Sequence, residues 1–298
     1  MHPLKTVMHK LFFTIIVGLL FCLLTSSYSV RSDDDSAQNW LKSQYDSWET
    51  SLAHFIPLLE SKRSEDQIKN QYQEVQTNFR KIQFLLEYIS EESVKRYING
   101  APLLSVELSI PTVNILEPKG LQVLDELLYS DSPDVQKIKK VAEELAKSLK
   151  NLKPVFVAAE LYEADIKRAI YKDIVRIYSL QLTGFDTPGS VSGIQNAIHN
   201  FRGMSEFLTM FYEVNIHTKT LVPLFNSAAD YLIHHQDFDT FDRVYFYKNH
   251  IANILKVLSK WDTNDLTILS RNPSEKWGIN FNAEHIFTTS LFNIDYFT

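Results

Sequence analysis

Apolar residues recur at alternating steps of three and four positions over most of the chain after Ser36, the spacing of a helix that buries one face. The clearest stripe contains Ile68, Tyr72, Val75, Phe79, Ile82, Leu86 and Ile89. A second stripe has the same rhythm, at Ile138, Ala142, Leu145, Leu149, Leu152, Phe156 and Ala159. Few strands could produce such stripes, so the pattern predicts an all-α protein whose long antiparallel helices enclose an apolar core.

Capping and helix-breaking residues predict where several of these helices begin, bend or end. The Asp-Ser-Pro sequence at 131–133 offers a capping side chain and a first-turn proline, so the second striped helix is expected to start there. Pro154 lies inside that stripe, and because the apolar rhythm continues beyond it we expect a kink rather than an end. Later helices are expected over 206–236, broken near Pro223, and over 238–261.

The segment 183–193, TGFDTPGSVSG, interrupts the helical pattern with three glycines, a proline and small polar residues. We therefore expect two helical-bundle halves, one at 36–182 and one at 194–262, joined by a linker at 183–193. An irregular aromatic tail is expected over 263–298.

One internal stretch, 99–117, departs from helical periodicity. Its apolar and polar residues alternate between two prolines, in the order Pro102, Val106, Glu107, Leu108, Ser109, Ile110 and Pro111. Alternation with a period of two is typical of a strand, and flanking prolines keep such a strand short. We expect an extended linker over the bundle, with at most a short strand near 104–115.

The N-terminus has the three regions of a secretory signal peptide. Lys5 and Lys10 precede an apolar run, which a small polar stretch follows, so cleavage is expected after Ser29 and the signal peptide covers 1–29. A membrane anchor is the competing interpretation, but the run is shorter than the roughly 20 residues that a spanning helix needs. We expect export to the periplasm, an acidic flexible leader at 30–35, and no transmembrane anchor after cleavage.

Composition excludes several kinds of chemistry. Cys22, the only cysteine, lies in the predicted signal peptide, so the mature chain would hold no disulfide, thiolate zinc site, iron–sulfur cluster or cysteine nucleophile. Covalent attachment of a c-type haem needs Cys-x-x-Cys-His, which is equally absent from the sequence. Without its signal the chain has 28 basic and 36 acidic residues in alternation, and no basic stripe, so nucleic acid is excluded as an expected partner.

The linker runs into a short amphipathic helix that opens with Glu117, Pro118, Lys119 and Gly120. This arrangement resembles the imelysin-like helical proteins, whose signature places Gly-x-His-x-x-Glu at the start of such a helix. The matching positions here are Gly120, Gln122 and Asp125. More specifically, the chain resembles the helical region that precedes the haem domains in dihaem cytochrome c peroxidase-like proteins of Bacteroidetes-type bacteria. The segments 185–190, 237–251 and 277–297 extend this resemblance over nearly the whole mature chain.

The resemblance implies a two-bundle build and a degenerate version of a metal site. Glutamine is a weak ligand for transition metals, so two interpretations of Gln122 and Asp125 stay open: a degenerate site for a harder cation, or buried polar groups that fix helix packing. The histidines show no metalloprotease or paired-ligand spacing. Two surface ion pairs are expected instead, one between Glu213 and His217 and one between Asp230 and His234. We identify no catalytic, cofactor-binding or metal-ligating residue.

Two functions are consistent with these observations. The first is a non-catalytic periplasmic helical module, associated with or truncated from a dihaem cytochrome c peroxidase-like protein. Its partner would be a dihaem peroxidase domain or a c-type cytochrome, and haem is expected only on a missing downstream region or on that partner. The alternative is a stand-alone imelysin-like periplasmic protein that binds a metal ion or haem. The sequence leaves open whether the chain belongs to an enzyme.

Overall fold

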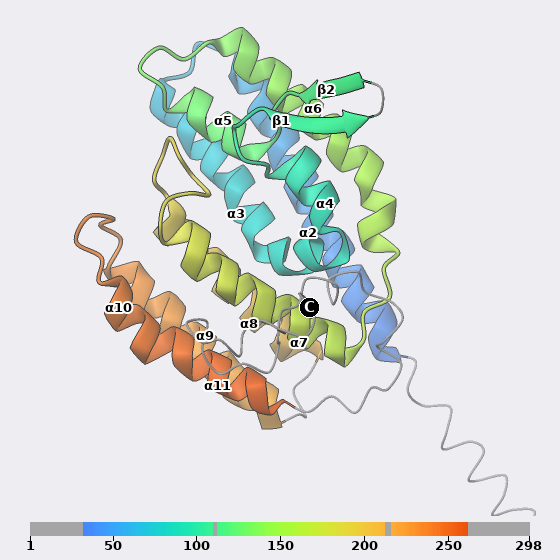
Figure 1. Cartoon of the computed structure of the whole chain (residues 1–298), viewed down its shortest axis with the longest axis vertical. Coiled ribbons are helices and arrows are strands. Elements are labelled where there is room, and N and C mark those ends of the chain that lie inside the picture. The colour runs from blue at the N-terminus through green and yellow to red at the C-terminus, as the bar shows by residue number, and fades with distance from the viewer. Residues whose placement is uncertain (1–31, 110–111, 212–215, 262–298) are drawn as a thin grey trace, which may run out of the picture.

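The computed structural model describes residues 32–109, 112–211 and 216–261, which form helices and one two-stranded hairpin (Figure 1). The all-α class predicted from the apolar periodicity is therefore confirmed. The elements, in chain order, are α2 (Ser32–Leu58), α3 (Glu65–Ile89), α4 (Glu91–Ser93), the π-helical turn η1 (Val94–Ile98), β1 (Ser105–Ser109), β2 (Thr112–Leu116), α5 (Leu121–Leu128), α6 (Val135–Val157), α7 (Glu163–Arg176), η2 (Ile177–Gln181), α8 (Gly193–Phe211), α9 (Ile216–His234), α10 (Arg243–Phe246), η3 (Tyr247–Ile251) and α11 (Ala252–Lys260).

Helix α3 is the central element, and α2, α7 and α8 all pack against it. Ser64 caps its N-terminus in a reciprocal capping box with Gln67, which satisfies two backbone donors that the first turn leaves open. The apolar stripe predicted from the sequence faces the core, and its residues from Tyr72 to Leu86 are fully buried. Sequence periodicity thus identified both this helix and its buried face.

Helix α2 begins at Ser32, so the expectation of a flexible leader is wrong for residues 32–35. The acidic run Asp33–Asp35 lies in the first turn of this helix. Residues 1–31, which include the predicted signal peptide, lie outside the described residues, as does the predicted tail. No helix within the described ranges is both long and apolar enough to cross a bilayer.

The stretch 99–117 forms a hairpin in which β1 and β2 pair antiparallel. Val106 stands opposite Ile115 and Leu108 opposite Val113, while a bridge between Asn99 and Gly120 closes the base. The sequence predicted at most one short strand near 104–115, because Pro111 interrupts the alternation. The same period of two continues in β2, which supplies the second strand.

Two predicted details of α6 are wrong. Asp134, not the sequence at 131–133, caps the helix, because its carboxylate accepts hydrogen bonds from the amides of Gln136 and Lys137. Pro154 does not kink a continuing helix: α6 ends at Val157, and α7 begins at Glu163 after a break. A proline in the last turn removes one helical hydrogen bond where the helix is already ending, and the break lets α7 turn back onto α3.

The expected break at Pro223 is also wrong, because α9 passes through this residue without interruption. Proline costs that helix one hydrogen bond, while its fixed φ remains compatible with helical geometry. The helices α8 and α9 are instead separated by residues 212–215.

The helices on the two sides of 183–193 share one hydrophobic core. Helix α8, from the predicted second half, packs along α3, from the first. Gly203 permits this approach, since a Cβ at that position would lie only 2.1 Å from the backbone oxygen of Lys81. The segment 183–193 is therefore a loop within a common core and does not separate two cores.

Candidate functional site

A cluster of polar side chains runs through the middle of this apolar core. Four members lie on α3, one or two helical turns apart, beside the apolar stripe. We call this set the polar cluster. All of its members are buried except Arg176, whose side chain is 20% exposed; the set consists of Gln76, Arg80, Gln83, Glu87, Gln122, Asp125, Asp173, Arg176, Gln181, Asp186, Asn196 and Asn200. It joins α3, α5, α7, η2, α8 and the loop 183–193.

Asp186, from the loop 183–193, is the centre of the polar cluster and is 2% exposed. Its carboxylate accepts hydrogen bonds from Arg80 Nη1 at 2.7 Å and from Arg176 Nη2 at 2.9 and 3.1 Å. Gln122 Nε2 donates to the same group at 2.9 Å. Burial opposes ionisation of Asp186, but the two guanidinium groups outweigh it and hold the pKa of this carboxyl below its usual range.

Asp125, on α5, holds the loop from the other side. Its Oδ2 accepts the backbone amides of Gly189 and Ser190 at 2.8 and 2.9 Å, and its Oδ1 accepts the Ser190 hydroxyl at 2.6 Å. Burial raises the pKa of Asp125, although these hydrogen bonds act in the opposite direction. The carboxylate thus fixes where the loop passes over α5.

The three residues of the imelysin-like motif come together as packing groups. Gly120 precedes α5 with a φ of 96°, a backbone conformation that favours glycine. Gln122 bridges Asp186 and the backbone oxygen of Asn99, and Asp125 binds the loop. This arrangement agrees with the interpretation of Gln122 and Asp125 as buried polar groups that fix helix packing.

Metal-ligating groups do not converge within the described residues, where no cluster of three or more histidine, cysteine, aspartate or glutamate side chains could hold an ion. The expected ion pair of Asp230 with His234 is replaced by a hydrogen bond from His234 Nδ1 to the backbone oxygen of Asp230 at 2.8 Å. The carbonyl can only accept, so Nδ1 carries the proton. Glu213 lies outside the described residues, and His217 stacks against Trp261.

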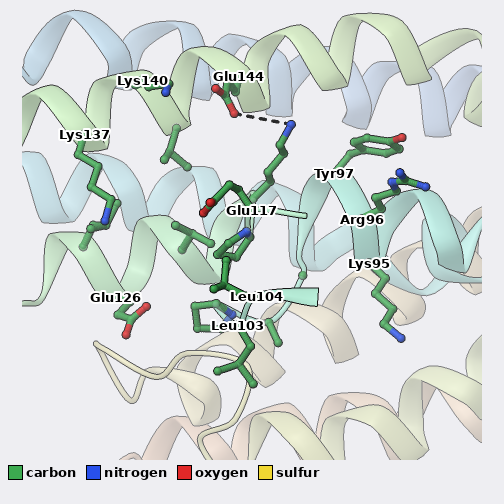
Figure 2. Close-up of a pocket in the computed structure, with 18 of the residues that line it drawn as sticks. Lys95, Arg96, Tyr97, Leu103, Leu104, Glu117, Glu126, Lys137, Lys140 and Glu144 are labelled. Atoms are coloured by element: carbon green, nitrogen blue, oxygen red, sulfur yellow. Dashed lines mark ion pairs between the residues drawn. The ribbon is translucent and has the colours of Figure 1, made fainter. Parts of the chain in front are cut away.

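Among the described residues, a groove lies at the base of the hairpin, with a volume of about 1060 Å³. We call it the hairpin groove; it is lined by α4, η1, the segments 100–104 and 117–119, and one face each of α5 and α6. Figure 2 shows Lys137, Lys140 and Glu144 on the α6 wall, with Lys95, Arg96 and Tyr97 on the η1 side.

The lining of the hairpin groove combines apolar and charged groups. Leu103 and Leu104 lie at its edge and are 72% and 62% exposed. Lys119 and Glu144 form an ion pair of 3.9 Å across it (Figure 2). The two adjacent exposed leucines form a small apolar patch rimmed by charged side chains, which makes this groove the candidate contact surface.

Helix α5 belongs to both features. Gln122 and Asp125 point into the polar cluster, while Val123, Glu126 and Leu127 line the hairpin groove. Because α5 has only eight residues, the polar cluster on one face fixes the position of the groove on the other.

Most of the polar cluster was not predicted from the sequence, although the sequence of α3 contains a signal for it. Gln76, Arg80, Gln83 and Glu87 recur at steps of four and three immediately beside the apolar stripe. A polar stripe of this kind is usually solvent-facing. Only the packing of α7, α8 and the loop against it reveals that it is buried.

Comparison with protein-family models gives no match for this chain, and comparison with curated protein sequences gives none either.

The role of Asp125 in packing leads to a measurable expectation. Asp125→Ala leaves two backbone amides and a hydroxyl without their acceptor, so the free energy of unfolding should fall by about 2–3 kcal/mol. Asp125→Asn keeps one acceptor oxygen and should lose less. Urea denaturation, with and without a chelator, measures both effects. If Asp125 served mainly to bind a metal ion, the chelator would lower the wild-type midpoint towards that of the variants.

Proposed function

We propose that this chain is a non-catalytic, exported helical module that docks a protein partner through the hairpin groove in the periplasm. The partner class follows from the sequence resemblance: a dihaem cytochrome c peroxidase domain or a c-type cytochrome, present as a separate protein or as part of a longer polypeptide. In this proposal, haem belongs to the partner, and the helical module positions it.

The exposed pair Leu103 and Leu104 at the groove edge is the observation that carries this proposal. Burying one leucine contributes about 1.5–3 kcal/mol, so a partner that covers both gains a substantial part of a binding energy. The surrounding lysines and glutamates would then act as the polar rim that gives an interface its specificity. The polar cluster fixes the position of α5, and α5 forms one wall of the hairpin groove.

The proposal is tested with a Leu103→Ser, Leu104→Ser double variant and a purified dihaem peroxidase domain. Binding, measured by surface plasmon resonance, should weaken by about tenfold or more, the loss expected when interface anchors are removed. Both leucines are exposed, so thermal unfolding should change little.

Val155→Ser is the matched control, because Val155 is a 51% exposed apolar residue on α6 that does not line the hairpin groove. It should bind like the wild type. Equal binding by all three proteins would contradict the proposed docking surface. So would a wild type that does not bind at about 100 μM, a concentration that corresponds to a weak binding free energy near −5.5 kcal/mol. In-frame Cys-x-x-Cys-His motifs beyond Thr298 would support the longer-polypeptide version.

The alternative proposal, a stand-alone metal- or haem-binding protein of imelysin-like type, is the weaker one. A metal ion at Asp125 would have to replace the hydrogen bonds from Gly189 and Ser190. Calorimetric titration of the purified chain with ferric ion, divalent ions and haem tests it. Binding tighter than millimolar that is lost in Asp125→Asn would make this alternative the better one.

A further inference from the structure

The polar cluster holds more acids than bases. Its acids, all buried, are Glu87, Asp125, Asp173 and Asp186, and its bases are the buried Arg80 and the 20% exposed Arg176. Asp186 takes an ion pair from each arginine, which leaves little positive charge for the other carboxyl groups. A buried carboxylate without a counter-charge is costly, so the folded state has reason to retain protons here.

Asp173, on α7, is the member with the fewest partners. It is 1% exposed, and its Oδ2 accepts a hydrogen bond from Asn200 Nδ2 at 3.0 Å. Its Oδ1 has no hydrogen-bond partner among the described residues. The neighbouring Glu87, on α3, shares Arg176 at 3.1 Å with Asp186. Asp173 therefore has neither an ion pair nor a full set of hydrogen bonds, and the nearby Glu87 has only a shared arginine as its ion-pair partner.

We propose that Glu87 and Asp173 form a proton latch, which closes the junction of α3, α7 and α8 while it is protonated and loosens this junction when a proton is released to solvent. The protonated carboxyl is neutral and can remain in the core beside Asn200. The deprotonated pair places two negative charges in a largely buried region, where Glu87 already faces Asp186. Helix separation, or entry of water, then lowers the electrostatic cost.

Every element that packs around the latch contributes to its electrostatics. Arg176 acts on both acids, Arg80 acts on Asp173 and Lys172 on Glu87, while Asp186 raises the pKa of Glu87. Helix α8 presents the neutral Asn200, and α3 presents the neutral Gln83, which hydrogen-bonds both Glu87 and Asn200. The arginines oppose proton uptake, but they are shared with Asp186.

The pKa values of both acids are shifted in the direction that the latch requires. Burial is the main cause that raises the pKa of Asp173 from 3.8 to about 7, and burial likewise raises the pKa of Glu87. The folded state thus binds this proton more tightly than the unfolded state does. The resulting stabilisation is complete at acid pH and is lost as the pH rises from near 4 to near 7.

The latch is tested by comparing the wild type with Asp173→Asn over a range of pH. In the wild type, the unfolding equilibrium constant from urea denaturation should rise on the order of 100-fold between pH 5 and pH 7, as expected for one released proton. In Asp173→Asn, which has no proton to lose at this position, the rise should be less than about tenfold. Glu143→Gln, at an exposed position on α6, is the control and should keep the wild-type profile.

A second readout separates a local latch from general destabilisation. Hydrogen exchange of residues 163–192 is measured at pH 6 and pH 8 and corrected for the intrinsic effect of pH. In the wild type only, the protection of these amides should fall by about tenfold or more, because local opening follows the same proton linkage. Should Asp173→Asn fail to fold, a carbon-13 NMR titration of the wild-type Asp173 carboxyl replaces it, with an expected midpoint near 7. Equal pH profiles for wild type and variant, or an Asp173 midpoint below 5, would overturn the proposal.

Discussion

Asp186→Ala should be the most destabilising single substitution in the polar cluster, with a loss of about 3–5 kcal/mol in the free energy of unfolding. The variant leaves Arg80 and Arg176 without the carboxylate that pairs with both of them. It also removes an acceptor from Gln122, which ties α5 to this centre. Urea denaturation followed by circular dichroism measures the loss.

Asp46→Ala is the matched control for this result. Asp46 also forms an ion pair, with Lys153, but its side chain is 48% exposed. Exposed pairs contribute no more than about 1 kcal/mol, so the control should lose little stability. Similar losses for Asp46→Ala and Asp186→Ala would contradict the central position of Asp186.

The same substitution should change the hairpin groove. Asp186 fixes Gln122, and Asp125 fixes the loop that carries Asp186, so the contacts reinforce each other on one face of α5. The opposite face of α5 lines the groove. Partner binding and core electrostatics are therefore expected to be coupled in this protein, although about one helix diameter separates the two surfaces.

The sequence predicted the elements that depend on local patterns. Helix α3 and its buried stripe follow from apolar periodicity. The composition of 183–193 correctly predicted a loop. It did not predict what the loop does, because Asp186 is buried only when Arg80, 106 residues away, is brought to it.

The candidate site was largely beyond sequence reasoning for the same reason. Gly120, Gln122 and Asp125 were singled out through a motif, but the partners of Gln122 and Asp125 in the loop are 64 residues or more away along the chain. The hairpin groove depends on how α5, α6 and η1 are arranged, which no local pattern specifies. Buried polar residues at helical spacing look like a solvent-facing stripe until the covering helices are in place.

Trp48→Ala should cause a comparably large loss, of about 3–5 kcal/mol, through the cavity that it leaves in the core. Trp48 is fully buried between α2 and α3, with its ring centroid 5.0 Å from that of Phe79 and 5.5 Å from that of Tyr45. Both aromatic contacts vanish together with the buried surface. Far-UV circular dichroism during urea denaturation is the suitable probe, because the substitution changes tryptophan fluorescence directly.

Trp48→Phe separates the aromatic packing from the rest of the side chain. The indole Nε1 has no hydrogen-bond partner among the described residues, so phenylalanine loses no hydrogen bond and keeps one ring against Phe79. We expect it to retain most of the stability, with a loss of about 1–2 kcal/mol for the smaller volume. If Trp48→Ala lost no more than Trp48→Phe, the α2–α3 interface would be looser than this packing indicates.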